Sequence, residues 1–206
     1  MASVGYDLYV KMIEETVREL RGDVQKGDIT TKVELHVDAF LPQDYVSSDL
    51  VRVEMYKKIA SINDEASRDD LMEELIDRFG DPTRPVINLV DIAHLKGLCS
   101  RIGIDLVSSK PGGLVMRFSQ SADLKPEYLI NALRGHERNI RLAAGSATQL
   151  IYSVGLTPKS DEELLQGAVP LMEDIVKKIA DEQAKGSQDA VERAALRVLT
   201  EEGEGK

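Results

Sequence analysis

The stretch PVINLVDIAHLKGLCSRIG, residues 85–103, decides how the rest of the chain folds. Pro85 suits the first turn of a helix, where its missing N–H would have had no partner, and Gly103 suits the end of one. Between them, apolar residues occupy most of the helical circumference instead of a single stripe. A helix that is apolar nearly all round is buried by packing on several sides. We therefore predict a central buried helix in a globular core.

Two amphipathic helices are predicted before this segment. The first runs from about Asp49 to Ser61, with Leu50, Val53 and Tyr56 on its apolar stripe. The second follows Ser67, which suits the N-cap position, and ends at Gly80. Steps of 100° per residue place five residues on its core face: Leu71, Met72, Leu75, Ile76 and Phe79.

Alternating apolar and polar residues predict the strands. Residues 32–40 alternate in this way, and Pro42 ends the pattern. The segments 104–108 and 114–119, which are joined by SKPGG, predict a hairpin or a pair of neighbouring strands. Residues 140–144 and 149–154 predict two more strands, after a helix at 126–134. Strands mixed irregularly with helices indicate an α+β fold, a small mixed sheet packed with several helices; a small mixed α/β sandwich is the alternative.

Both ends of the chain are predicted to be helical. Residues 6–21 have an apolar stripe at helical spacing, and a polar linker containing glycines follows. At the other end, residues 160–185 predict an acidic helix and residues 187–206 one more helix with a frayed, charged end. We therefore divide the chain into an N-terminal helix and linker (1–31), a central domain (32–155) and an acidic helical C-terminal segment (156–206).

The composition excludes several classes of protein. The formal net charge is −10, which disfavours a protein that binds nucleic acid regardless of sequence, because neutralising phosphates requires clustered Lys and Arg. No apolar run is long enough to cross a bilayer, and the N-terminus does not resemble a secretion signal. A single cysteine, Cys99, excludes an internal disulfide framework and is typical of a reducing cytoplasm.

Motifs that would carry catalysis are absent from the sequence. No G-x-x-x-x-G-K-[ST] phosphate loop occurs, and no serine or cysteine lies in a nucleophile elbow. His36, His94 and His136 have no ligand-like spacing to one another or to Cys99. His94 and Cys99 lie on the central helix, where packing roles are the commoner use. These observations favour a binding or regulatory module over an independent enzyme, and they predict no metal or cofactor.

The order of several segments resembles a known family. From about residue 4 to residue 155 the chain is similar to the C-terminal domain of bacterial transcription-repair coupling factors, with the last helix of their translocase motor in front. The segments that carry this resemblance are VGYDLYVKMIEETV for the motor helix, and ELHVDAFLPQDYV, RVEMYKKIASI, DLMEELIDRFGDP, VINLVDIAHLKGLCSRIGI and GGLVMRF for the domain.

The resemblance implies a function for the parent protein and a role for this part of it. Family members are ATP-dependent translocases on double-stranded DNA, which displace stalled RNA polymerase and recruit the repair protein UvrA. Their ATP- and Mg-binding motor motifs lie upstream of the residues present here, so this part is not expected to hydrolyse ATP. In the family, the C-terminal domain packs on the UvrA-binding module and masks it. The implied role is thus an autoinhibitory protein-interaction domain.

The acidic face of the second amphipathic helix is the predicted contact. The resemblance assigns Glu74 and Asp77 to the interface with arginines of the UvrA-binding module. Helical geometry adds Asp70 and Glu73 as neighbours. The pattern alone also fits a solvated surface without a partner. A rival hypothesis is an accessory contact with DNA or the motor, for which Arg52, Lys57 and Lys58 are the candidate residues.

Overall fold

The computed structural model describes residues 29–145, 147–155 and 159–201, and within residues 187–201 it describes only the backbone. The helix predicted at residues 6–21 lies outside the described residues. The elements follow one another as β1 (Lys32–Glu34), α2 (Asp49–Ala60), α3 (Glu65–Phe79), α4 (Arg84–Arg101), β2 (Ile104–Lys110), β3 (Gly113–Phe118), α5 (Pro126–Ala132), β4 (Ile140–Ala143), β5 (Gln149–Ser153) and α6 (Asp161–Glu201). The predicted α+β class is confirmed.

The five strands form one mixed sheet in the order β1-β2-β3-β5-β4. β1 pairs with β2 in parallel, and the other neighbours are antiparallel. The predicted hairpin of β2 and β3 is confirmed: Lys110 pairs with Gly113 across a two-residue turn of Pro111 and Gly112. Gly112 has a φ of 80°, which glycine adopts at this position of a turn without steric cost.

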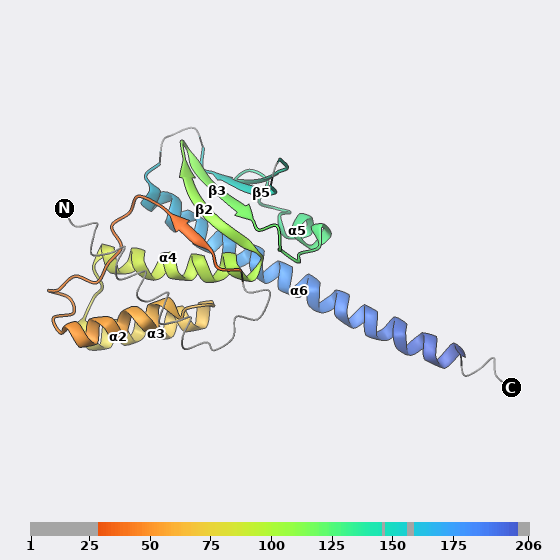
Figure 1. Cartoon of the computed structure of the whole chain (residues 1–206), viewed down its shortest axis with the longest axis horizontal. Coiled ribbons are helices and arrows are strands. Elements are labelled where there is room, and N and C mark those ends of the chain that lie inside the picture. Colours follow the sequence, from red (N-terminus) through yellow and green to blue (C-terminus); the bar gives the residue numbers. More distant parts are fainter. Residues whose placement is uncertain (1–28, 146, 156–158, 202–206) are drawn as a thin grey trace.

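Helix α4 lies between two apolar cores, as the sequence predicts. On one side it packs with α6 against the sheet, and Leu95, Leu98 and Cys99 are buried there. On the other side Val86, Leu89 and Val90 pack against α2 and α3. Figure 1 shows the resulting layers: the sheet, then α4 and α6, then the pair of α2 and α3.

The predicted strand at 32–40 is correct only for its first part. The side chains continue to alternate between inside and outside up to Ala39, but ladder pairing with β2 ends at Glu34. Beyond it the backbone bonds to helix starts instead: the His36 N–H donates to the Asp161 carboxylate (2.7 Å) and the Phe40 N–H to the Pro85 carbonyl (3.3 Å). The segment therefore leaves the sheet and lies against α4 and α6.

The C-terminal segment is one continuous helix, not two. α6 runs through the exposed Pro170 and continues without a break to Glu201. The prediction of a separate last helix beginning at residue 187 is therefore wrong for the described residues. The first half of α6 is buried in the same core as the sheet, with Leu165, Met172 and Ile175 fully covered. Its second half extends away from the body of the molecule (Figure 1). The division of the chain at residue 155 stays a prediction, although the sheet and α6 share one core.

Gly97 is the point of closest approach between α4 and the α2–α3 connection. A Cβ placed there would lie 2.9 Å from both the Asn63 Cα and the Ile62 carbonyl oxygen. Replacing an exposed helical glycine by alanine normally stabilises a protein by about 0.5–1 kcal/mol. For Gly97→Ala we expect the opposite, a loss of about 1–3 kcal/mol, because the backbone has to move. Urea unfolding followed by circular dichroism measures the change, and increased stability would contradict the packing described.

Candidate functional site

Helix α3 carries the predicted acidic face, and its start is fixed by a capping box. The Asp64 carboxylate accepts a hydrogen bond from the Ser67 N–H (2.8 Å), and the Ser67 hydroxyl accepts one from the Asp64 N–H (3.3 Å). The prediction of Ser67 as N-cap is wrong, because the cap is Asp64 and Ser67 occupies the third helical position, where its hydroxyl serves the reciprocal bond.

Two leucines fix the rotation of α3 about its axis. Leu71 and Leu75 are buried against α2 and α4, with exposed fractions of 5% and 0%. A further constraint is the ion pair between Arg68 of α3 and the buried Asp91 of α4 (3.1 Å). These contacts turn the opposite side of the helix toward solvent.

Three of the four predicted carboxylates lie on that exposed side. Asp70, Glu73 and Asp77 are exposed, and none of them makes a hydrogen bond or ion pair with the part of the chain that the structure describes. They are spaced at three and four residues and therefore share one helical face. Chemically, this face offers three unpaired anionic acceptors to a cationic partner.

Glu74 is oriented differently from the other three. Its carboxylate accepts hydrogen bonds from Lys58 of α2 (2.7 and 2.8 Å) and from Arg78 one turn on (2.5 Å). Both cations also lie near Glu54 of α2, at 3.6 and 3.9 Å. The hydrogen bonds from Lys58 and Arg78 lower the pKa of Glu74, and the bond to Glu74 raises the pKa of Lys58. Glu74 thus joins α3 to α2 within the domain.

Sequence reasoning missed Ile76, which the helical pattern assigned to the core. Its side chain is 46% exposed, next to Asp77 and one turn from Glu73. The cause is that α2 and α4 cover the sides of α3 that carry Leu71 and Leu75, which leaves position 76 at the edge of the buried surface. This exposed apolar side chain is available to pack against an apolar group of a partner.

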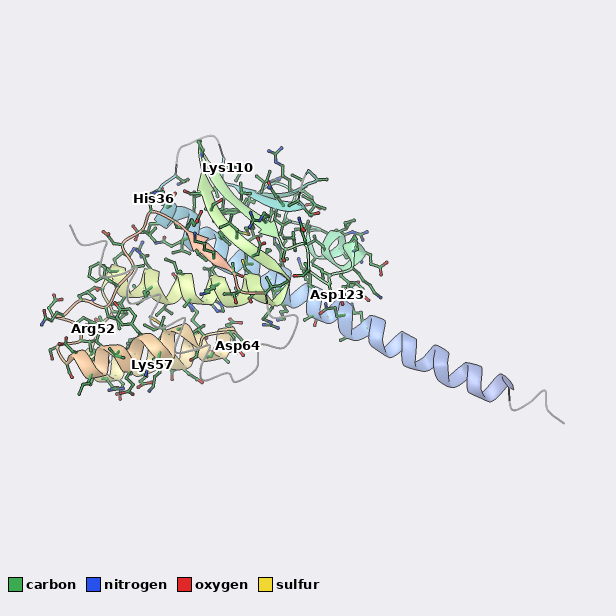
Figure 2. All side chains as sticks on the ribbon, viewed as in Figure 1. His36, Arg52, Lys57, Asp64, Lys110 and Asp123 are labelled. Carbon is green, nitrogen blue, oxygen red and sulfur yellow. The ribbon has the colours of Figure 1, made fainter. Side chains whose placement is uncertain are left out.

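The basic residues of the rival hypothesis do not form a free cluster. Arg52 donates to the Val46 carbonyl (2.8 Å) and pairs with Asp49. Lys58 is bound to Glu74, and Lys57 is exposed on α2 (Figure 2). Since two of the three cations are already bound within the domain, they are poorly placed to bind a phosphate backbone. Leu50, expected in the apolar stripe of the same helix, is 85% exposed because it lies in the first turn, ahead of the buried Met55 and Ile59.

Two of the residues considered for catalysis or metal binding, Cys99 and His94, are buried in the core. Burial raises the pKa of the Cys99 thiol far above its ordinary value, so the thiolate is not accessible as a nucleophile. His94 is completely buried, and its Nε2 lies 2.8 Å from the Glu173 carboxylate. In the described part of the chain, no group of three or more His, Cys, Asp or Glu side chains is placed to hold a metal ion. Among the described helices, none combines the length and apolar composition needed to cross a membrane.

Comparison with known proteins identifies the domain that carries this face. The family model for the TRCF domain matches residues 35–129. The crystal structure of the C-terminal domain of a transcription-repair coupling factor superposes with a TM-score of 0.64 and 25% identity, covering 76% of this chain and 98% of that one. Residues 35–129 form a TRCF domain. α2, α3 and α4, and with them the acidic face, lie within these residues.

Transcription-repair coupling factors of several bacteria are similar to the chain in sequence. The protein of Staphylococcus epidermidis is 39% identical over 133 residues, which are 62% of this chain and 11% of that protein. The protein of Escherichia coli is 32% identical over 159 residues, 75% of this chain and 14% of that protein. The chain therefore spans roughly one seventh or less of the length of these relatives.

The hydrogen bonds of Glu74 should make the stability of the domain depend on pH. Because its pKa is lowered in the folded state, the ionised carboxylate stabilises the domain fully above the unfolded pKa of about 4.3, and this contribution is lost as the pH falls through the folded pKa. We expect Glu74→Gln to destabilise the domain by about 1 kcal/mol at pH 7 and to reduce the loss of stability on acidification.

The matched control is Asp77→Asn, which removes the same charge from the same helix at a residue without a partner in the described structure. Its unfolding free energy should remain within about 0.5 kcal/mol of the parent's. Urea titrations at pH 7 and pH 4 measure both variants. Equal effects of the two substitutions would contradict the bridge from Glu74 to α2.

Proposed function

We propose that this TRCF domain is an autoinhibitory, protein-interaction domain that packs on the UvrA-binding module of the same protein. The parent protein, by this proposal, is an ATP-dependent DNA translocase of the cytoplasm that displaces stalled RNA polymerase and recruits excision repair through UvrA. ATP and Mg serve its motor, and the TRCF domain itself hydrolyses no ATP. The membership of the domain in the TRCF family supports this reading.

The observation that carries the proposal is the acidic face of α3. Asp70, Glu73 and Asp77 are exposed and unpaired within the described structure, with the half-exposed Ile76 among them. Arginines on a partner would form charge-assisted hydrogen bonds to these carboxylates, and an apolar partner group would cover Ile76. Contacts between domains of one chain commonly cover about 600–1,500 Å², which is large enough to be specific and small enough to separate.

Glu74 has a separate role in this proposed interface. Its carboxylate is bound to Lys58 and Arg78, so a partner arginine would have to compete with two cations already in place. Glu74 therefore contributes mainly by holding α3 against α2, and Asp77 is the one of these two residues that contacts the partner directly. Reversing the charge at either position weakens binding, but for different reasons.

The test is a calorimetric titration of the 206-residue chain with the isolated UvrA-binding module of the family, at low and at high salt. We expect binding that weakens with salt, because the contact depends on exposed charges. Asp77→Arg should weaken it by about 2 kcal/mol or more without changing the stability of the domain. Glu74→Arg should weaken binding and also destabilise the fold.

The control variant is Asp123→Arg, which reverses an exposed charge on the loop before α5, away from α3 (Figure 2). It should bind as the unsubstituted chain does. Equal loss of binding in Asp123→Arg and Asp77→Arg would mean that net charge alone attracts the module. Unchanged binding in Asp77→Arg would contradict the assignment of the acidic face.

A further inference from the structure

Arginines without an ion pair lie at one edge of the sheet. Arg134 follows α5, Arg138 lies in the turn before β4 and Arg141 lies in β4, and all three are exposed. None of them forms an ion pair or a side-chain hydrogen bond with the residues that the structure describes. By contrast, five other arginines each pair with a carboxylate: Arg52, Arg68, Arg78, Arg84 and Arg117. This edge therefore offers free positive charge in a chain of net charge −10.

The three arginines differ in how far nearby carboxylates offset their charge. Arg134 lies close enough to Glu137 and Glu182 to interact with both carboxylates electrostatically. Arg138 and Arg141 have no such partner within the described part of the chain. Arg138 and Arg141 are therefore the two cations best able to bind an anion from outside the domain.

The strand that carries Arg141 has an open side. β4 pairs with β5 alone. The Ser153 N–H donates to the Asn139 carbonyl (2.7 Å), and in an antiparallel pair the bonds to β5 then fall on every second residue, at Arg141 and Ala143. The N–H and C=O of Leu142 therefore point away from the sheet, and no other described backbone group bonds to them. The Leu142 side chain is 42% exposed.

The alternation of side chains along β4 defines the pattern that a partner strand needs. Ile140 is buried in the core on the helix-covered face of the sheet, and Leu142 lies on the same face. Arg141 lies on the opposite face, where Ile151 of β5 is its register partner. A strand added antiparallel to β4 would place one residue opposite Leu142 and the next residue opposite Arg141. A complementary strand therefore has an apolar residue flanked by acidic ones.

We propose that the free edge of β4 binds an extended, acidic segment of another protein. The backbone of this segment pairs with the N–H and C=O of Leu142, which is how free sheet edges accept an added strand. An apolar side chain of the segment covers Leu142, and flanking carboxylates accept hydrogen bonds from Arg141 and Arg138. The planar guanidinium of arginine matches a carboxylate through two parallel bonds. The site is separate from the acidic face of α3, because β5, the neighbour of β4, lies on the far side of the molecule from α3 (Figure 1).

A nucleic acid fits this edge less well than an acidic peptide does. The nearby cations of α6 that could extend the positive surface already have partners: Lys178 pairs with Asp174 (2.7 Å) and Lys185 with Glu182 (3.2 Å). Binding a phosphate backbone requires a longer row of free cations. Two arginines beside an open strand edge are sufficient for a short peptide, because backbone hydrogen bonds supply part of the affinity.

The test uses the 206-residue chain labelled with ¹⁵N and a capped Thr-Glu-Val-Glu-Thr pentapeptide as the probe. We expect saturable shifts of the backbone amides of Arg141, Leu142 and Ala143, with a dissociation constant of about 1 mM, a weak affinity suited to few contacts. The same peptide with glutamine in place of glutamate should bind about tenfold more weakly, because hydrogen bonds to charged groups are the stronger ones. A third peptide, N-methylated at valine, keeps both carboxylates and loses the donor to the Leu142 carbonyl. It should bind at least about fivefold more weakly, since a backbone hydrogen bond contributes about 1 kcal/mol.

Variants of the two arginines locate the binding site. Arg138→Gln and Arg141→Gln should each weaken binding of the glutamate peptide about fivefold to tenfold, since each removes a charge-assisted contact. The matched control is Lys57→Gln, which removes an exposed cation without a described partner from α2 and should leave binding unchanged. All three positions are exposed, so the amide spectra of the variants should otherwise match that of the unsubstituted chain.

Several results would overturn the proposal. If no peptide binds, the arginines only prevent β4 from pairing with other chains. Equal binding of the glutamate and glutamine peptides would exclude the carboxylate contacts, and equal binding of the N-methylated peptide would exclude strand addition. If oligothymidylate shifts the same amides at lower concentrations than the peptide, the ligand is a nucleic acid. If the same shifts follow from raising the concentration of the chain alone, the occupant is a second copy.

Discussion

The burial of α4 on two sides is the constraint on which the rest of the structure depends. One side completes the core of the sheet and α6, and the other completes the core of α2 and α3. Two of its buried polar residues are tied to these neighbours: Asp91 to Arg68 of α3, and His94 to Glu173 of α6. A buried polar or charged group that loses its partner is destabilising, so these contacts permit few alternative positions of α3 and α6 relative to α4.

This arrangement determines which charges face solvent. One side of α3 is fixed against its neighbours by Leu71, Leu75 and Arg68. The carboxylates of the helix therefore have different surroundings. Glu74 turns toward α2, where Lys58 neutralises it, while Asp77, only three residues later, stays unpaired within the described structure. Two residues that belong to one short motif thus have different electrostatic surroundings. One stabilises the domain, and the other keeps its full capacity to bind a partner.

The sequence predicted the features that local physics controls and missed those that depend on distant neighbours. The turn at Pro111 and Gly112 and the all-round apolar character of α4 follow from a few adjacent residues. Helical periodicity cannot reveal that Lys58 of another helix neutralises Glu74, or that Ile76 lies at the edge of the buried surface. The side-chain amide of Asn88 likewise donates to the Asp38 carbonyl and lies near the Glu162 carboxylate, and these residues are 50 positions before it and 74 positions after it.

The energetics of the acidic face bear on how an autoinhibitory contact would operate. Three exposed carboxylates contribute about 0–1 kcal/mol each when paired at a surface. Burying the exposed half of Ile76 adds about 1 kcal/mol, since complete burial of such a side chain contributes about 1.5–3 kcal/mol. Holding 99% of the molecules closed requires about 2.7 kcal/mol, which is half of the roughly 5.5 kcal/mol that a signal must supply to reverse the ratio. The contribution of the face is of the same order as the first value and below the second, so a signal of that size can release it. A covalent connection within one long chain stabilises the closed state further, because it raises the effective concentration of the partner. The contact is therefore tighter inside the intact protein than between separate fragments.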